Sequence, residues 1–107
     1  MNIFFPKEHN NETRFSLTGE TAEKFLKKNI NLFVETNIHV LDTTLKNLIE
    51  SKSIQVVERD HGLSSANIIC SLNKLLLEDI QKIKSETLVI SFLDPFNENK
   101  LIEDLKN

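Results

Sequence analysis

The chain has 107 residues and a mass of 12.3 kDa, which fits one domain and is too little for two. Its 13 Lys and Arg residues against 16 Asp and Glu residues give a net charge of −3 at pH 7, which argues against a nucleic-acid partner because such surfaces are basic. No apolar run approaches the roughly 20 residues of a membrane-spanning helix, so the sequence predicts no direct membrane span.

Glycine and cysteine are scarce, and their scarcity excludes several kinds of site. The two glycines, Gly19 and Gly62, are too few for a dinucleotide fingerprint or a Walker loop, in which glycines let backbone N–H groups approach a phosphate. The single cysteine, Cys70, excludes an intrachain disulfide and a thiolate zinc site, and it is expected to be a buried structural thiol. The three histidines lack the spacing of metal ligands. We therefore expect no metal and no cofactor bound by this chain alone.

The first half of the chain predicts alternating strands and helices. The apolar run Asn2–Phe5 stops at a proline, which is typical of a strand. Residues 18–29 combine helical apolar spacing with acidic residues near the start and lysines near the end, so they predict a helix with Thr18 as N-cap and Asn29 as a left-handed stop. Residues 32–35 predict the second strand, and Asp42 can cap a second helix.

The second half continues the same alternation. Residues 54–57 are β-branched and few, which is typical of an edge strand, and the apolar run 66–72 indicates a strand buried on both faces. Apolar side chains at helical spacing over 76–83 predict a further helix. Residues 87–93 predict another buried strand, and apolar residues at 101, 102 and 105 predict a short last helix.

This order of elements, β-α-β-α-β-β-α-β-α, predicts the fold class. Alternation with near-continuous apolar strands is typical of a mostly parallel sheet with helices on both faces. We expect a single α/β three-layer domain, Rossmann-like or flavodoxin-like, with a sheet of about five strands. The strands at 2–5 and 66–72 are expected to be central.

The loop after the first strand carries a motif. It reads Pro6-Lys7-Glu8, Asn11-Glu12-Thr13-Arg14 and Leu17-Thr18 ahead of a helix. This motif resembles the opening of the alanine dehydrogenase and proton-translocating nicotinamide nucleotide transhydrogenase family. The resemblance continues through the strand at 32–35 with its final glutamate, and through 68–73 and 87–95, so that it covers essentially the whole chain. Asn73, and Ser91-Phe92 followed by Pro95, resemble the NAD(H)-binding alpha subunit of transhydrogenase.

The resemblance implies both a domain and an assembly. In the family's NAD(H)-binding subunit, the N-terminal stretch forms most of the Rossmann-like domain that lacks the dinucleotide fingerprint. Residues 1–107 are thus expected to form one such domain, without the NAD-binding Rossmann domain, which a partner chain would bring. NAD and NADP are implied for the family assembly, as are a homodimer and a cytoplasmic location, peripheral to the inner membrane through partner subunits.

Three departures from the family pattern argue against alanine chemistry. The family has glycines after the second strand, where this chain has Thr36-Asn37-Ile38. Ser71 stands where alanine dehydrogenases have a substrate-contacting lysine, and Asp94 stands at the position of their catalytic histidine. Of that substrate site only Arg14 is kept, so the resemblance implies no catalytic residue in this chain.

Four residues of the first loop are candidates for binding an anion or for ordering the loop: Lys7, Glu8, Glu12 and Arg14. A guanidinium forms bidentate pairs with carboxylate or phosphate, so Arg14 can bind an anionic group. Alternatively, it pairs with Glu8 or Glu12 and orders the loop. Residues 16–21 resemble the phosphate loop of flavodoxins, with helix capping by Thr18 as the competing interpretation.

The sequence therefore predicts a transhydrogenase alpha-subunit-like protein, part of or derived from an NAD(P) transhydrogenase. In this hypothesis the chain is a scaffold and partner-docking domain that is inactive alone. One alternative is a free-standing, non-catalytic interaction module or relic of the family. A further alternative is a small flavin or anion binder through residues 16–21.

Overall fold

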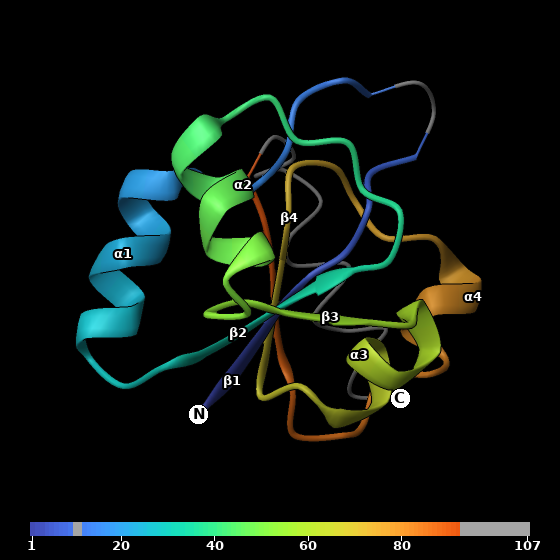
Figure 1. Ribbon diagram of the computed structural model, residues 1–107. Helices are drawn as coiled ribbons and strands as arrows, with labels where there is room; N and C mark the ends of the chain where they lie inside the picture. The colour runs from blue at the N-terminus through green and yellow to red at the C-terminus, as the bar shows by residue number, and fades with distance from the viewer. Residues whose placement is uncertain (10–11, 93–107) are drawn as a thin grey trace.

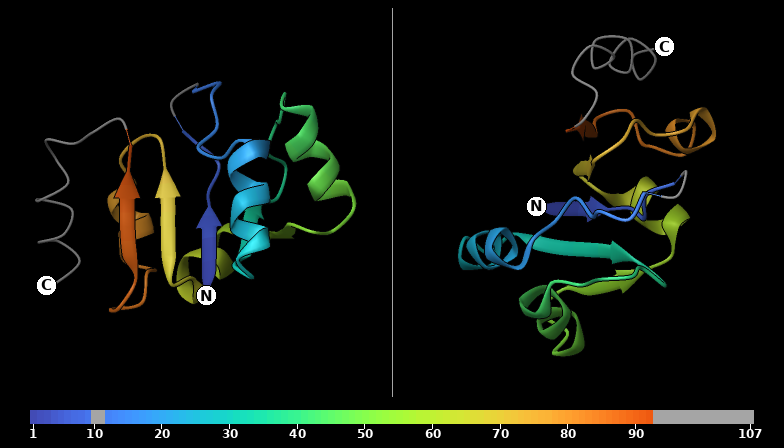
Figure 2. Two further views of the ribbon diagram at one scale, coloured as in Figure 1. Left: turned by 90° about the vertical axis from the view of Figure 1, so that its left-hand side faces the viewer. Right: turned by 90° about the horizontal axis from the view of Figure 1, so that it is seen from above.

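Five parallel strands form the centre of the protein. The computed structural model describes residues 1–9 and 12–92 (Figure 1). The strands are β1 (Asn2–Phe5), β2 (Asn31–Glu35), β3 (Gln55–Val57), β4 (Ile68–Ser71) and β5 (Leu88–Ser91). They lie in the order β3-β2-β1-β4-β5, and every neighbouring pair is parallel. In the left view of Figure 2, the arrows of β5, β4 and β1 run side by side in one direction. The prediction that the first and fourth strands lie inside the sheet is confirmed.

Helices cover both faces of this sheet. They are α1 (Gly19–Lys27), α2 (Thr43–Glu50), α3 (Arg59–Ser65) and α4 (Leu77–Ile80). In Figure 1, α1 and α2 lie on one side of the strands, and α3 and α4 lie on the other. Because successive strand side chains point to opposite faces, Phe5 packs in one core with Leu45 of α2, whereas Phe4 packs in the other with Leu63 of α3. The prediction of a Rossmann-like α/β domain is confirmed.

Helix α3 corrects the predicted order of elements, in which two strands followed one another at this point. Strands β3 and β4 are parallel and lie on opposite sides of the β2–β1 pair. The chain must therefore cross over a face of the sheet between them. The crossover helix has only seven residues, and its buried positions are Gly62 and Leu63. It thus lacks the repeated apolar spacing from which longer helices are recognised.

Other boundaries differ from the prediction by a few residues, as strand and helix ends commonly do. Strands β4 and β5 are shorter than the apolar runs 66–72 and 87–93, and α4 is a single turn. Helix α1 has the predicted N-cap, Thr18, and ends before Asn29, whose φ is 61°. The predicted last helix and Asp94 lie outside the described residues.

Candidate functional site

The topology of the sheet indicates where a ligand site belongs. In parallel α/β sheets, ligands bind outside the carboxyl ends of the strands, where successive connections lead in opposite directions. Here the chain leaves β1 toward β2 and β3 and then returns to place β4 and β5 on the other side of β1. The loops that follow β1 and β4 therefore form the candidate site, and the first of them carries the sequence motif.

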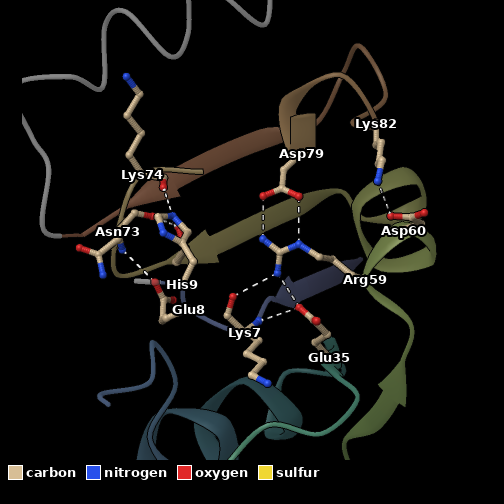
Figure 3. A network of polar contacts seen from close by, with 11 residues as sticks. Lys7, Glu8, His9, Glu35, Arg59, Asp60, Asn73, Lys74, Asp79 and Lys82 are labelled. Atoms are coloured by element: carbon tan, nitrogen blue, oxygen red, sulfur yellow. Dashed lines mark hydrogen bonds and ion pairs between the residues drawn. The ribbon is translucent and has the colours of Figure 1, made fainter. Parts of the chain in front are cut away.

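Glu8 bridges these two loops. Its carboxylate accepts hydrogen bonds from the backbone N–H groups of Leu72 and Asn73, each at 3.0 Å (Figure 3 shows Glu8 beside Asn73). Two successive N–H groups that donate to the two oxygens of one carboxylate form an anion-binding arrangement. In this chain the anion they bind is the carboxylate of Glu8, so the loop after β1 fills the crevice at the reversal point.

Glu12 makes a second connection to the loop after β4. Its Oε1 accepts from Asn73 Nδ2 at 3.1 Å and from Arg14 Nη2 at 2.9 Å, and its Oε2 accepts from Arg14 Nε at 3.0 Å. The side chain of Glu12 is 13% exposed, whereas that of Arg14 is 65% exposed. The hydrogen bonds from Arg14, followed by that from Asn73, lower the pKa of Glu12 to about 2.

All four predicted site residues line one cleft. Lys7, Glu8, Glu12 and Arg14 border a hollow of about 340 Å³ between the loops that follow β1 and β2. Its walls also include apolar side chains, namely Phe15, Ile38 and Leu41. The cleft thus combines two cations with carboxylates that already accept hydrogen bonds from the chain itself. In the structure, Arg14 pairs with a carboxylate of its own loop, which is one of the two interpretations of this residue. The carboxylate is that of Glu12 and not that of Glu8.

His9 adds a third link between the same loops. Its Nε2 lies 2.9 Å from the carbonyl oxygen of Lys74, which makes this nitrogen the donor (Figure 3). Its Nδ1 is buried and has no hydrogen-bond partner within the described ranges. Sequence spacing alone gave no reason to single out His9, because Lys74 lies 65 positions away in the chain.

Arg59 is the centre of a second polar network, which the sequence analysis missed (Figure 3). The guanidinium binds Asp79 through two parallel hydrogen bonds, Nε to Oδ1 at 2.9 Å and Nη2 to Oδ2 at 2.7 Å. Its Nη1 donates to Glu35 Oε1 at 2.6 Å and to the carbonyl of Lys7 at 3.1 Å. Glu35 Oε1 also accepts the N–H of Lys7 at 2.9 Å. One arginine at the start of α3 thereby joins α4, the end of β2 and the loop after β1.

The charges of this network stabilise one another. The hydrogen bonds from Arg59 hold the pKa of Asp79 below its usual range, although burial opposes this effect. The same two bonds, together with the hydrogen bond to Glu35, raise the pKa of Arg59. The side chain of Asp79 is 4% exposed and that of Arg59 is 24% exposed. Because Nε, Nη1 and Nη2 all donate to protein oxygens, Arg59 acts as a structural bridge rather than as a binding group.

Residues 16–21 use their hydrogen-bonding groups within the chain. The hydroxyl of Thr18 accepts from the N–H of Thr21 at 3.2 Å, and the N–H of Gly19 donates to Asp42 Oδ2 at 2.9 Å. Asp42 also caps α2, because its Oδ1 accepts from the N–H of Leu45 at 3.0 Å. The hydrogen bond from Gly19, followed by that from Leu45, lowers the pKa of Asp42. A carboxylate therefore stands at the start of α1, and these contacts favour capping over phosphate binding.

Positions that depart from the family pattern have structural roles. Asn37 has a φ of 63°, a left-handed conformation that asparagine and glycine tolerate best, so asparagine can occupy this position, where the family pattern has a glycine. Ser71 is buried, and its hydroxyl donates to the carbonyl of Asn73 at 2.6 Å. Burial raises the pKa of the Cys70 thiol to about 11, which suits a structural residue and not a nucleophile.

Within residues 1–9 and 12–92, no three His, Cys, Asp or Glu side chains lie close enough together to hold a metal ion. Within the same ranges, no helix has the length and apolar composition needed to cross a membrane.

The contacts of Glu12 predict a pH dependence of stability. The folded-state pKa of about 2 lies below the ordinary value of about 4.3 for glutamate. Glu12 therefore stabilises the folded state fully above about pH 4.3, and this contribution is lost as the pH falls toward 2. We expect Glu12→Gln to lower the thermal unfolding midpoint at pH 7. Near pH 2 the variant and the wild type should have the same midpoint.

The matched control is Glu20→Gln, which removes the same charge from an exposed position whose nearest cation, Lys24 Nζ, is 3.7 Å away. Thermal unfolding followed by circular dichroism between pH 7 and pH 2 measures both variants against the wild type. The prediction would be contradicted if the thermal midpoint of the wild type exceeded that of Glu12→Gln by the same amount at pH 7 and at pH 2.

Comparisons with known proteins agree with this architecture. The family model described as "Alanine dehydrogenase/PNT, N-terminal domain" matches residues 4–107. The crystal structure of transhydrogenase from Sinorhizobium meliloti is similar to 98% of this chain with a TM-score of 0.74 and 20% sequence identity. This chain covers 32% of that one, so it spans about a third of the length of that transhydrogenase. No curated protein matches.

Proposed function

The chain belongs to the family of alanine dehydrogenase/PNT N-terminal domains, and we propose that it is a non-catalytic scaffold on which a dinucleotide-binding partner chain docks. In this proposal it is alpha-subunit-like and is part of, or derived from, an NAD(P) transhydrogenase in the cytoplasm. The partner brings the fold that holds the nicotinamide cofactors, and hydride passes between NAD(H) and NADP(H) in the assembly. The chain itself positions the partner and takes no part in the chemistry.

The observation that carries this proposal is the bridge made by Glu8. The backbone N–H groups of Leu72 and Asn73 are the donors best placed at the reversal point to receive the phosphate or carboxylate of a ligand. Both donate to Glu8, so a small anion would have to displace a carboxylate that the chain itself holds in place. This arrangement supports a rigid surface in preference to a substrate pocket.

Both glycines support the same proposal. A Cβ at Gly19 would lie 2.5 Å from Thr44 Cβ, and a Cβ at Gly62 would meet the ring of Phe4. Each glycine therefore allows a helix to pack closely against its neighbour. Neither is free to form a loop around a phosphate.

The test has two parts, beginning with the isolated chain. Calorimetric titration with NAD(H) and with NADP(H) is expected to show no binding up to about 1 mM, and a hydride-transfer assay is expected to show no turnover. After it has been mixed with FMN and separated from the free FMN, the protein is expected to be colourless. Micromolar binding of either dinucleotide by this chain alone would overturn the scaffold proposal.

The second part concerns the partner. The chain is co-expressed with a neighbouring gene product that carries a G-x-G-x-x-G motif, and the complex is purified through a tag on one chain. Charge reversal on the cleft, Lys7→Glu with Arg14→Glu, is expected to weaken this association, whereas reversal of the exposed Lys24 to Glu on α1 should leave it intact. Failure of every such chain to associate would favour the free-standing module or relic.

A further inference from the structure

One face of the sheet is uncovered at β4 and β5. Helices α1 and α2 lie on this face, and α1 packs against β2. In the left view of Figure 2, both helices stand on the side of β1 away from β4, and neither lies in front of the arrows of β4 and β5. Parallel sheets have helices on both faces. Within residues 1–9 and 12–92, this part of the sheet therefore lacks the layer that is typical of the fold.

An apolar stripe of Leu88, Ile90 and Phe92 lies on this uncovered area. Ile90 packs against the core on the side of α1 and α2, whereas its neighbour Val89 belongs to the core on the other side. Because the side chains of a strand alternate between faces, Leu88 points to the same side as Ile90. Phe92 continues this spacing, since its N–H extends the β4–β5 ladder to the carbonyl of Ser71 at 3.0 Å. Leu88 and Phe92 are each 52% exposed, so the stripe faces solvent.

The opposite face of β5 is already covered. Val89 is buried there, in the same core as Ile80 of α4 and Leu63 of α3. Ile83, which follows α4, packs against this core as well. A segment that continues from the end of β5 therefore finds exposed apolar surface on the side of α1 and α2, and not on the side of α3 and α4.

Residues 93–107 have a sequence that suits the stripe. They follow β5 directly and lie outside the described residues. The family model of the N-terminal domain extends to residue 107, so they belong to this domain. On a helix, Leu101, Ile102 and Leu105 fall within an arc of about 100°, and Lys100 and Glu103 fall on the opposite side. A helix of about ten residues is about 15 Å long, which matches the roughly 13 Å spanned by the four residues of β5.

We propose that residues 93–107 turn back from the end of β5 and pack the apolar side of a helix on the stripe, antiparallel to the strand. Leu105 then lies beside Leu88 at the start of β5, and the polar side of the helix faces solvent. The segment is favoured over a separate chain because a short tether gives it an effective concentration on the order of millimolar. With the stripe covered, a partner chain is left the cleft beside Lys7 and Arg14 as its docking surface.

A double-variant series on the full chain tests the contact. Leu88→Ser and Leu105→Ser are each expected to lower the thermal unfolding midpoint by about 4 °C or more, because each removes one side of the same apolar contact. Together they should lower it by little more than the larger single change. The control is Leu77→Ser on α4, an exposed leucine (64%) whose effect should add to that of Leu105→Ser. Circular dichroism measures the midpoints. Full additivity of Leu88→Ser and Leu105→Ser would overturn the proposal.

Cross-linking identifies what covers the stripe. A short bifunctional maleimide is expected to link the variant Leu88→Cys, Leu105→Cys within one chain at least about tenfold faster than Leu88→Cys, Glu103→Cys, because Glu103 lies on the opposite side of the helix. The native Cys70 is buried and the pKa of its thiol is raised to about 11, so it stays unreactive. Faster linking in Leu77→Cys, Leu105→Cys would place the segment on α4 and overturn the proposal. Links through Leu88→Cys that join two molecules would assign the stripe to another copy and overturn it as well.

Discussion

Arg59→Met is expected to destabilise the folded domain by about 2–4 kcal/mol, a large share of the roughly 5–15 kcal/mol typical of a domain. The substitution keeps an unbranched apolar side chain but removes both side-chain hydrogen bonds that Asp79 accepts from Arg59. The carboxylate of Asp79 is 4% exposed and would remain buried without its two hydrogen bonds. The expected cost lies below that of a fully buried pair because Arg59 is 24% exposed. Chemical denaturation at pH 7 measures the loss.

The neighbouring pair of Lys82 and Asp60 provides the control. Its Nζ–Oδ1 distance is 2.8 Å, but its side chains are 45% and 71% exposed, so Lys82→Met should cost less than about 1 kcal/mol. The double variant Asp79→Leu, Arg59→Met should lose less stability than the sum of the losses in the two single variants. The reason is that it leaves no unpaired carboxylate at position 79. If Arg59→Met lowered the free energy of unfolding no more than Lys82→Met does, Arg59 would not be the structural bridge described above.

The fold could be predicted from the sequence where a pattern repeats within an element. Strand β1 was found because an apolar run ends at Pro6, and α1 because its apolar side chains recur at helical spacing after Thr18. Helix α3 has one short buried patch around Gly62 and so offers no repeat to recognise. Its existence follows only from topology, since two parallel strands on opposite sides of β1 need a crossover.

The candidate site was predictable in its residues but not in its contacts. The motif after the first strand named Glu8, Glu12 and Arg14, and all three line one cleft. The partners of Glu8, however, lie 64 and 65 positions further along the chain. Arg59 was missed for the same reason, because its three acceptors come from three different segments that only the parallel sheet brings together. Pairing between distant segments leaves no periodic signal in one sequence.

Gly62→Ala is expected to destabilise the domain by about 2 kcal/mol, the opposite of what helix propensity alone predicts. Alanine inside a helix is favoured over glycine by about 1 kcal/mol. At this position, however, a Cβ would lie 2.5 Å from Cδ1 and Cζ of Phe4, closer than carbon atoms pack. Phe4 is completely buried on the middle strand, so its ring cannot move away without disturbing the core. Overpacking of this kind costs about 3 kcal/mol, which exceeds the gain from propensity.

Phe4→Leu separates this steric effect from any effect on the helix itself. The shorter side chain leaves room for a Cβ at Gly62, so Gly62→Ala should be neutral or stabilising when Phe4→Leu is also present. Ser64→Ala, on the exposed side of the same helix, should change stability by less than about 0.5 kcal/mol. Denaturant midpoints of the four variants and the wild type measure these differences. If Gly62→Ala destabilised the domain equally whether position 4 holds phenylalanine or leucine, the close approach of α3 to β1 would not be the cause of the loss of stability.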